Sequence, residues 1–269
     1  MINGPGEAGA TVLHLGPHAD DELIGAPATL LALREAGWRV VNLTCSLGSG
    51  DQRERRRAEV TEACRRAGFV SEILDDPLPD PLPSGSAQDA GARLVPALRD
   101  AVARLGPRVV VAPSPHDRHR GHEVVGRAAV EVCAAEGGVE RLWLWGLWAD
   151  LPFPSLAVAY GEGRMEEILA ALAAHAGELR RNDYRRLVRG RAEMLAVVGP
   201  ERAFGFGTPG SASPYVEVLT ELGRWAGHWR LAQARWLDPA QPIGALGALD
   251  LDEWLASPSL TDRFGAPGG

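Results

Sequence analysis

Residues 11–22, TVLHLGPHADDE, contain the pattern that decides the fold. The segment 11–15 is apolar and β-prone, which predicts a buried strand. Gly16 and Pro17 end that strand, and residues 22–36 then carry apolar side chains at helical spacing before Gly37. Strand, loop and helix in this order predict the opening unit of an α/β protein.

The same unit recurs along the first half of the chain. Further strands are predicted at residues 39–45, 72–74, 108–112 and 141–146, with helices at about 51–67, 88–105 and 122–135. This alternation predicts a Rossmann-like, doubly wound α/β fold with a mainly parallel sheet and helices on both faces. We expect strand order 3-2-1-4-5 and a catalytic core over residues 1–155.

Residues 156–269 are interpreted as a C-terminal extension packed on that core, the two forming one structural unit. Helices are expected at about 162–175 and 182–198. Beyond them the sequence is rich in glycine and proline and contains four tryptophans: Trp225, Trp229, Trp236 and Trp254. No internal repeat is present.

Composition excludes several classes of partner. The 269 residues include 45% hydrophobic ones, and the net charge of −7 leaves no basic field for a nucleic acid. No apolar run is long enough for a membrane span, and the N-terminal MINGPGEAGA is unlike a signal peptide, so we expect a cytoplasmic protein. The three cysteines, Cys45, Cys64 and Cys133, are expected to be buried hydrophobes. The sequence leaves the oligomeric state open.

Two polar clusters follow predicted strands. His18, Asp20, Asp21 and Glu22 come after the first strand, and PSPHDRHRGH at residues 113–122 comes after the fourth. In a doubly wound sheet these two strands are neighbours at the switch point, so both clusters should face one crevice. The alternative for residues 20–22 is a solvated helix N-terminus.

Imidazoles and carboxylates without thiolates favour a catalytic zinc site, although iron(II) accepts the same donors. The nucleophile elbow, HExxH, P-loop and dinucleotide motifs are absent. Two other interpretations stay open: an amidase acting on a non-sugar or thiol-conjugate amide, and a non-catalytic Rossmann-type module for a nucleotide or methyl donor.

The two clusters resemble those of the PIG-L (LmbE-like) family of zinc-dependent N-deacetylases. PHADDE matches that family's usual PHPDDE, and His119 and His122 match its HxxH. The resemblance covers roughly residues 11–200. It implies one zinc ion per chain, bound by His18, Asp21 and His122.

The resemblance also implies roles for the remaining groups. Asp20 would be the general base, and His119 would stabilise the oxyanion or act as the acid. Arg56, within an R-x-x-E pattern, would contact a sugar, although an arginine-rich run like the one around it is more often a solvated helix face. Two departures stand out: Ala19 replaces a proline, and Gly121 replaces an aspartate that would lie beside His119. Asp117 is a candidate replacement for that carboxylate.

Aromatic side chains suggest where the substrate would bind. Trp143, Trp145 and Trp148 cluster at the end of the fifth strand, near Phe153, and are either core residues or a substrate platform. A later histidine, His175, is either a pocket wall or a surface residue. With the family resemblance, the platform implies an N-acetylglucosaminyl group carried on a large natural product, as in glycopeptide-antibiotic (teicoplanin-type) biosynthesis.

Overall fold

The computed structural model describes residues 9–80, 82, 86–238 and 248–249. The strands of its first half are β1 (Thr11–Gly16), β2 (Arg39–Ser46), β3 (Val70–Leu78), β4 (Val109–Pro113) and β5 (Arg141–Trp145). The helices between them are α1 (Asp21–Ile24), α2 (Pro27–Glu35), α3 (Arg53–Ala67), α4 (Ala87–Leu105) and α5 (Arg120–Ala135). The five strands are parallel and lie in the order β3-β2-β1-β4-β5, which confirms the predicted order.

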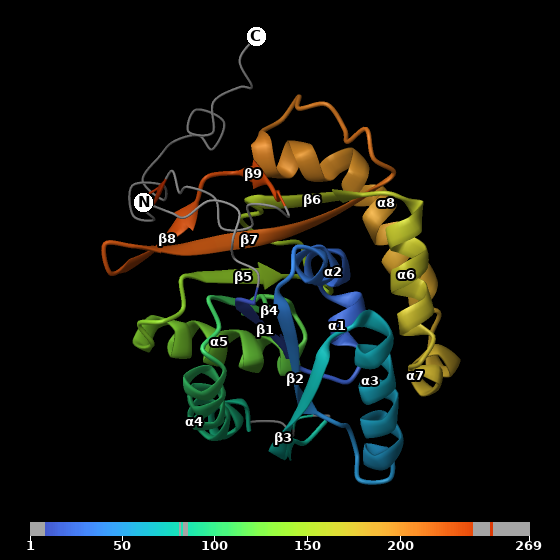
Figure 1. The fold of residues 1–269 in the computed structure, drawn as a ribbon, viewed down its shortest axis with the longest axis vertical. Helices are drawn as coiled ribbons and strands as arrows, with labels where there is room; N and C mark the ends of the chain where they lie inside the picture. Colours follow the sequence, from blue (N-terminus) through green and yellow to red (C-terminus); the bar gives the residue numbers. More distant parts are fainter. Residues whose placement is uncertain (1–8, 81, 83–85, 239–247, 250–269) are drawn as a thin grey trace.

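Helices cover both faces of the sheet, as predicted. Alternate residues of each strand point to opposite faces. Val109 and Val111 of β4 join the core formed with α1, α2, α3, α6 (Glu162–Leu172) and α8 (Tyr184–Phe204). Val110 and Ala112 join the core formed with α4 and α5. Figure 1 shows α4 and α5 on one side of the sheet and α2, α3 and α6 on the other. The three cysteines are free and buried in these cores.

The second half of the chain extends the same sheet. Its elements are β6 (Leu156–Tyr160), α6 (Glu162–Leu172), α7 (Ala176–Arg181), α8 (Tyr184–Phe204), β7 (Tyr215–Trp225), β8 (His228–Ala232), β9 (Arg235–Trp236) and β10 (Ala248–Leu249). β7 pairs antiparallel with β5 through residues 220–223 and with β6 through residues 215–219. The sheet therefore runs across the boundary placed at residue 155, and β6 to β10 are strands that the sequence analysis did not predict.

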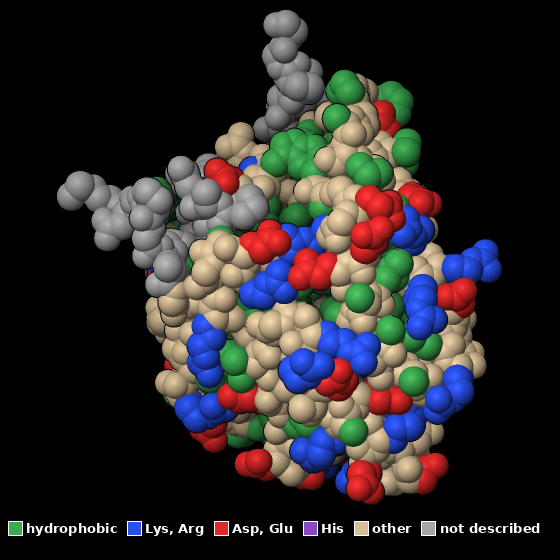
Figure 2. All heavy atoms as spheres, turned by 45° about the vertical axis from the view of Figure 1, so that its right-hand side comes forward, with side chains coloured by type: hydrophobic (Ala, Val, Ile, Leu, Met, Phe, Trp, Pro, Cys, Tyr) green, Lys and Arg blue, Asp and Glu red, His purple; other side chains and the backbone are tan. Residues whose placement is uncertain are grey.

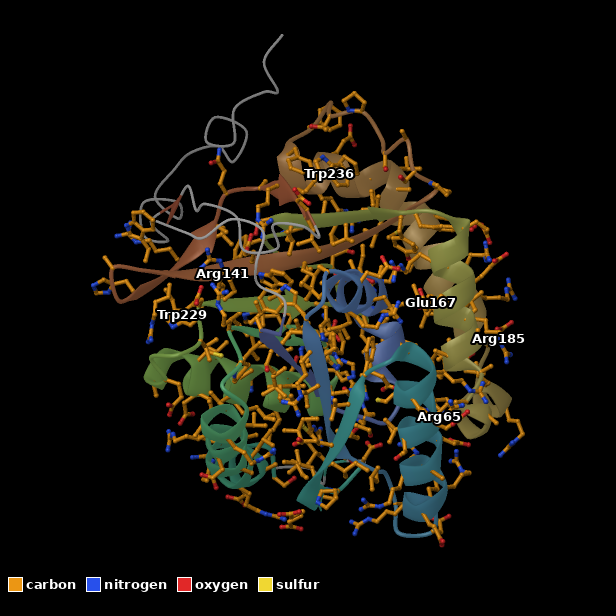
Figure 3. The ribbon with its side chains drawn as sticks, in the orientation of Figure 1. Arg65, Arg141, Glu167, Arg185, Trp229 and Trp236 are labelled. Atoms are coloured by element: carbon orange, nitrogen blue, oxygen red, sulfur yellow. The ribbon has the colours of Figure 1, made fainter. Side chains whose placement is uncertain are left out.

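Charged groups on β7 tie the two halves together. Glu217 accepts hydrogen bonds from the backbone N–H groups of Ala28 and Thr29, at 3.0 and 2.9 Å, and so caps the N-terminus of α2. Glu221 accepts two hydrogen bonds from Arg235 and lies 3.5 Å from Arg141, which Figure 3 places between β5 and β7.

The tryptophans of the second half lie in or beside these strands. Trp229 of β8 donates to the carbonyl of Cys133 at 3.0 Å and so joins the sheet to α5 (Figure 3). The ring of Trp236 in β9 lies 5.3 Å from that of Phe204 at the end of α8. Trp225 ends β7, and Trp254 lies outside the described residues.

Candidate metal centre and active site

Two loops at one edge of the sheet bring together five of the predicted site residues. The loop after β1 leads to His18, Asp20 and Asp21, and the loop after β4 leads to His119 and His122. β1 and β4 are adjacent and parallel, so both loops leave the sheet at its carboxyl edge. The centroids of the three imidazole rings lie 4.6 to 5.1 Å apart.

The donor atoms of His18, Asp21 and His122 are spaced as a metal requires. Asp21 Oδ2 lies 3.2 Å from His18 Nδ1, and Asp21 Oδ1 lies 3.5 Å from His122 Nε2. Ligand atoms held tetrahedrally at about 2.0–2.1 Å from zinc lie roughly 3.3 Å from one another. Each carboxylate oxygen of Asp21 thus lies near this separation from a ring nitrogen of one of the two histidines, as a shared ion would require. His119 borders the same space, since it has a ring nitrogen within 4.8 Å of those of His18 and His122.

The pKa values of the two adjacent carboxyl groups, Asp20 and Asp21, shift in opposite directions. Burial alone would raise the pKa of Asp21, but the neighbouring His122 and His18 outweigh it and lower that pKa. Asp21 is thus kept in the ionised form that binds a metal. In contrast, burial and the charge of Asp21 raise the pKa of Asp20 to about 7.

The same residues do not form a solvated helix N-terminus. Asp20 occupies the N-cap position of α1 but makes no side-chain capping hydrogen bond, and it is only 6% exposed. Asp21 and Glu22 are buried as well. Since burying acidic groups is costly, their placement requires partners, and the imidazoles supply them.

Asp117 orients the ring of His122 through a hydrogen bond to its Nδ1. Its Oδ2 lies 2.7 Å from His122 Nδ1, and its Oδ1 accepts hydrogen bonds from the backbone N–H groups of Leu147, Trp148 and Ala149. An ionised carboxylate only accepts hydrogen bonds, so His122 Nδ1 carries the proton and Nε2 is free to face a metal. The expectation that Asp117 stands beside His119 is therefore wrong: the structure pairs it with His122.

The region around Gly121 explains the missing carboxylate. A Cβ at Gly121 would lie 2.9 Å from His18 Nε2, so the ring of His18 occupies the space that a larger residue would need. Burial, together with the nearby His18 and His122, lowers the pKa of His119 to about 4. Among the described residues, the buried Nδ1 of His119 has no hydrogen-bond partner.

Two of the three predicted platform tryptophans are core residues. Trp143 and Trp145 are 0% exposed and lie on the sheet face that packs against α1 and α2. Trp143 donates to Glu221 at 3.1 Å, and the ring of Trp145 meets that of His122 edge-on at 5.1 Å. Their assignment to substrate is wrong because both faces of a central parallel strand are covered. Trp145 instead packs against the ring of His122 from within the core.

His175 is neither a pocket wall nor a surface residue. It is 0% exposed, and its Nε2 lies 2.6 Å from Glu22 Oε1. Burial alone would lower the pKa of His175, but the charge of Glu22 outweighs it and raises that pKa. The pair joins the start of α7 to the catalytic loop, so His175 supports the site without lining it.

A cavity of about 480 Å³ opens onto the metal centre. The site residues that line it are His18, Asp20, Asp21, Arg56, His119, His122 and Trp148; the others are Ile24, Ser49, Gln52, Arg55, Asp80, Gly177, Glu178, Arg181 and Tyr184. Phe153 is not among the lining residues. Trp148 is 44% exposed, with its ring 6.3 Å from that of His119, so it remains a candidate substrate contact.

Arg56 is a buried cavity residue and not part of a solvated helix face. Its guanidinium lies 2.9 Å from Glu178 and 3.6 Å from Asp80, and Asp80 in turn lies 3.7 Å from His18 Nε2. A chain of alternating charges thus joins α7 to the metal centre. Sequence reasoning missed Asp80, although its place in the loop after the third predicted strand, at the same sheet edge, was a usable signal.

The surface in Figure 2 shows acidic and basic side chains interspersed, with no continuous field of one sign on that face. Within the described residues, no helix combines the length and the apolarity needed to cross a membrane.

Comparisons with known proteins agree with this geometry. Residues 13–133, which contain every predicted metal ligand, match the family described as PIG-L, GlcNAc-PI de-N-acetylase. No curated protein matches the chain.

Three solved structures share the fold. A40926 pseudoaglycone deacetylase Dbv21 is 19% identical over 77% of this chain and 95% of its own, with a TM-score of 0.61. Teicoplanin deacetylase Orf2, in a zinc-inhibited form, is 17% identical over 81% of this chain and 100% of its own, with a TM-score of 0.58. N,N'-diacetylchitobiose deacetylase from Pyrococcus horikoshii is 20% identical over 83% of this chain and 87% of its own, also with a TM-score of 0.58.

At these identities the structural likeness establishes the fold, whereas the family rests on the matched sequence. Residues 13–133 of this chain are thus similar to the PIG-L (LmbE-like) family of N-deacetylases.

Proposed function

We propose that this protein is a zinc-dependent N-deacetylase that removes the acetyl group from an N-acetylglucosaminyl substrate. One observation carries the proposal: three converging metal donors and a separate buried carboxyl group, Asp20, line the same end of one cavity. Hydrolysis of an amide requires an activated water, a polarised acyl oxygen and a protonated leaving nitrogen. The site has a candidate group for each of these tasks.

His18, Asp21 and His122 would hold the ion, which when bound polarises the acyl oxygen and lowers the pKa of a water. The carboxylate of Asp20 is free of a capping bond and would take the proton from that water. His119, which lines the same cavity beside His18 and His122, would donate to the developing oxyanion or to the departing nitrogen. Asp117 and Trp145 keep the ring of His122 in place by a hydrogen bond and an edge contact.

The lining of the cavity supports a sugar as substrate. Ser49, Gln52, Arg56, Glu178 and Tyr184 offer donors and acceptors around a volume of about 480 Å³. Sugar hydroxyl groups require such partners when they leave water. The name of the matched family, GlcNAc-PI de-N-acetylase, points to the same acetamido sugar.

We propose that the N-acetylglucosaminyl group is carried on a large natural product of the glycopeptide type. The likeness to the teicoplanin and A40926 deacetylases motivates this choice. The likeness to the diacetylchitobiose deacetylase shows that the fold also serves an enzyme named for a small saccharide.

The experiment is acetate release from a substrate panel by protein with a measured zinc content. The panel contains free N-acetylglucosamine, diacetylchitobiose, an N-acetylglucosaminyl pseudoaglycone and an N-acetylcysteine conjugate. Acetate release from the N-acetylglucosaminyl compounds supports the proposal. Release from the thiol conjugate alone would show that the substrate is a non-sugar amide. Absence of release from all four, with zinc bound, would refute deacetylation of these substrates.

A further inference from the structure

A second cavity, of about 630 Å³, lies beyond Trp148. It is lined by the segment after β5 and by one side of α8: Gly146, Leu147, Trp148, Ala149, Asp150, Leu151, Arg186, Leu187, Gly190, Arg191, Met194, Leu195 and Arg202, with Val218 of β7. Trp148 lines both this cavity and the one at the metal centre. We call the second cavity the Trp148 groove.

Part of the groove wall is apolar and partly open to solvent, although Asp150, Arg186, Arg191 and Arg202 also line it. Leu195 and Val218 are buried at its base, while Leu151 and Leu187 are half-buried. Met194 is 44% exposed, as is Trp148. A folded protein gains nothing from exposing large apolar side chains, so neighbouring ones that line a cavity mark a binding site.

Polar contacts join the two walls of the groove to each other and to the end of α1. Arg191 of α8 donates to the carbonyl of Gly25, next to α1, at 3.3 Å and to the carbonyl of Gly146, which follows β5. Arg202 pairs with Asp150 at 2.6 Å across the groove. The position of the apolar wall is therefore set relative to the catalytic cavity, which a substrate bound in both would require.

The chemistry of an N-acetylglucosaminide links the two cavities. The sugar carbon that bears the aglycone is bonded directly to the carbon that bears the acetamido nitrogen. With the acetamido group at the metal centre, the aglycone must leave the sugar close to that centre. The ring of Trp148 is 6.3 Å from that of His119 and stands where the catalytic cavity meets the groove.

We propose that the Trp148 groove binds the apolar aglycone of an N-acetylaminosugar glycoside whose acetamido group lies at the metal centre. This inference rests on the proposed deacetylation and adds that the aglycone selects the substrate. The sugar alone would occupy only the catalytic cavity. Burial of the aglycone would then favour glycosides with an apolar substituent over free sugars.

The test compares octyl and methyl N-acetylglucosaminides, the octyl compound being kept below its critical micelle concentration. Acetate release by the zinc-loaded enzyme gives kcat/KM. Calorimetry in an Asp20→Asn background, where the glycoside is not consumed, gives Kd. Met194→Glu places a charge in the groove, and Val197→Glu is the matched control, since Val197 is 67% exposed on the same helix but does not line the groove.

We expect the octyl glycoside to bind about tenfold or more tightly than the methyl glycoside, because each buried methylene adds to affinity. Met194→Glu should remove that preference and leave the methyl glycoside unaffected, and Val197→Glu should change neither. Equal affinities for the two glycosides, or an octyl preference that survives Met194→Glu, would overturn the inference. If neither glycoside releases acetate while the Met194-dependent binding preference persists, the proposed reaction fails and the groove stands.

Discussion

Replacing Asp117 by asparagine should separate metal affinity from catalysis. In the native site, Asp117 accepts from the Nδ1–H of His122 at 2.7 Å and from the backbone N–H groups of residues 147–149. In Asp117→Asn, the amide oxygen can keep the three backbone donors, which turns the amide N–H₂ toward His122. His122 must then accept at Nδ1 and carry its proton on Nε2, the nitrogen that faces Asp21 and the ion.

The size of the effect follows from the contacts that are lost. Removing an outer carboxylate that orients a ligating histidine costs about 10- to 100-fold in metal affinity. Because each tenfold change is about 1.4 kcal/mol, this is roughly 1.4–2.7 kcal/mol of zinc binding. At saturating zinc the ion is restored to the same ligands, so kcat should return close to the wild-type value.

The assay is a zinc titration against a competing chelator, followed by kcat at saturating zinc and thermal unfolding of the loaded protein. Asp150→Asn is the control, since Asp150 lies in the same segment but is exposed and pairs with Arg202. A wild-type zinc Kd in Asp117→Asn would refute the proposed orientation of His122. A kcat that stays low with zinc fully bound would show that Asp117 acts on the reaction and not through the metal.

Three further experiments test other parts of the structure. Gly121→Ala should lower zinc affinity, measured by the same titration, because its Cβ would lie 2.9 Å from His18 Nε2, whereas Gly91→Ala, which meets nothing within 4 Å, should have no effect. Glu217→Gln should lose about 1–3 kcal/mol of stability by disturbing the cap of α2, lowering Tm by roughly 2–4 °C per kcal/mol, and an unchanged Tm would contradict the cap. Trp143→Phe should lower Tm and leave KM unchanged, while Trp148→Ala should raise KM with little change in Tm. The reverse pattern would show that Trp143 contacts the substrate.

The parallel half of the fold could be predicted because most of its strands are short apolar runs that alternate with helical patterns. The antiparallel strand β7 could not. Its sequence, YVEVLTELGRW, places Glu217 and Glu221 inside an apolar run. Both carboxylates are buried, and their partners come from distant residues: α2 for Glu217 and Arg235 for Glu221. The sequence does not show these partners, so it cannot distinguish a buried acidic residue from an exposed one.

The convergence of His18, Asp21 and His122 could be predicted because these residues occupy two short motifs at strand ends, whose meeting is required by the strand order. The substrate wall depends on side-chain direction, which the motifs do not contain. Trp143 and Trp145 point to the same face of β5, and that face is covered by helices. His175 reaches Glu22 across 153 positions of sequence, so only the folded chain shows the pair.

The most direct test of the central claim is zinc content and acetate release measured together in Asp20→Asn and Asp21→Asn. Asp20 is assigned as the base and Asp21 as a ligand, and the two are adjacent in the chain. We predict that Asp20→Asn keeps its zinc and loses activity by a factor on the order of 10² to 10⁴, the usual contribution of a general base. Asp21→Asn should lose zinc and activity together. Loss of zinc in Asp20→Asn with retention in Asp21→Asn, or wild-type acetate release from either variant, would contradict the account.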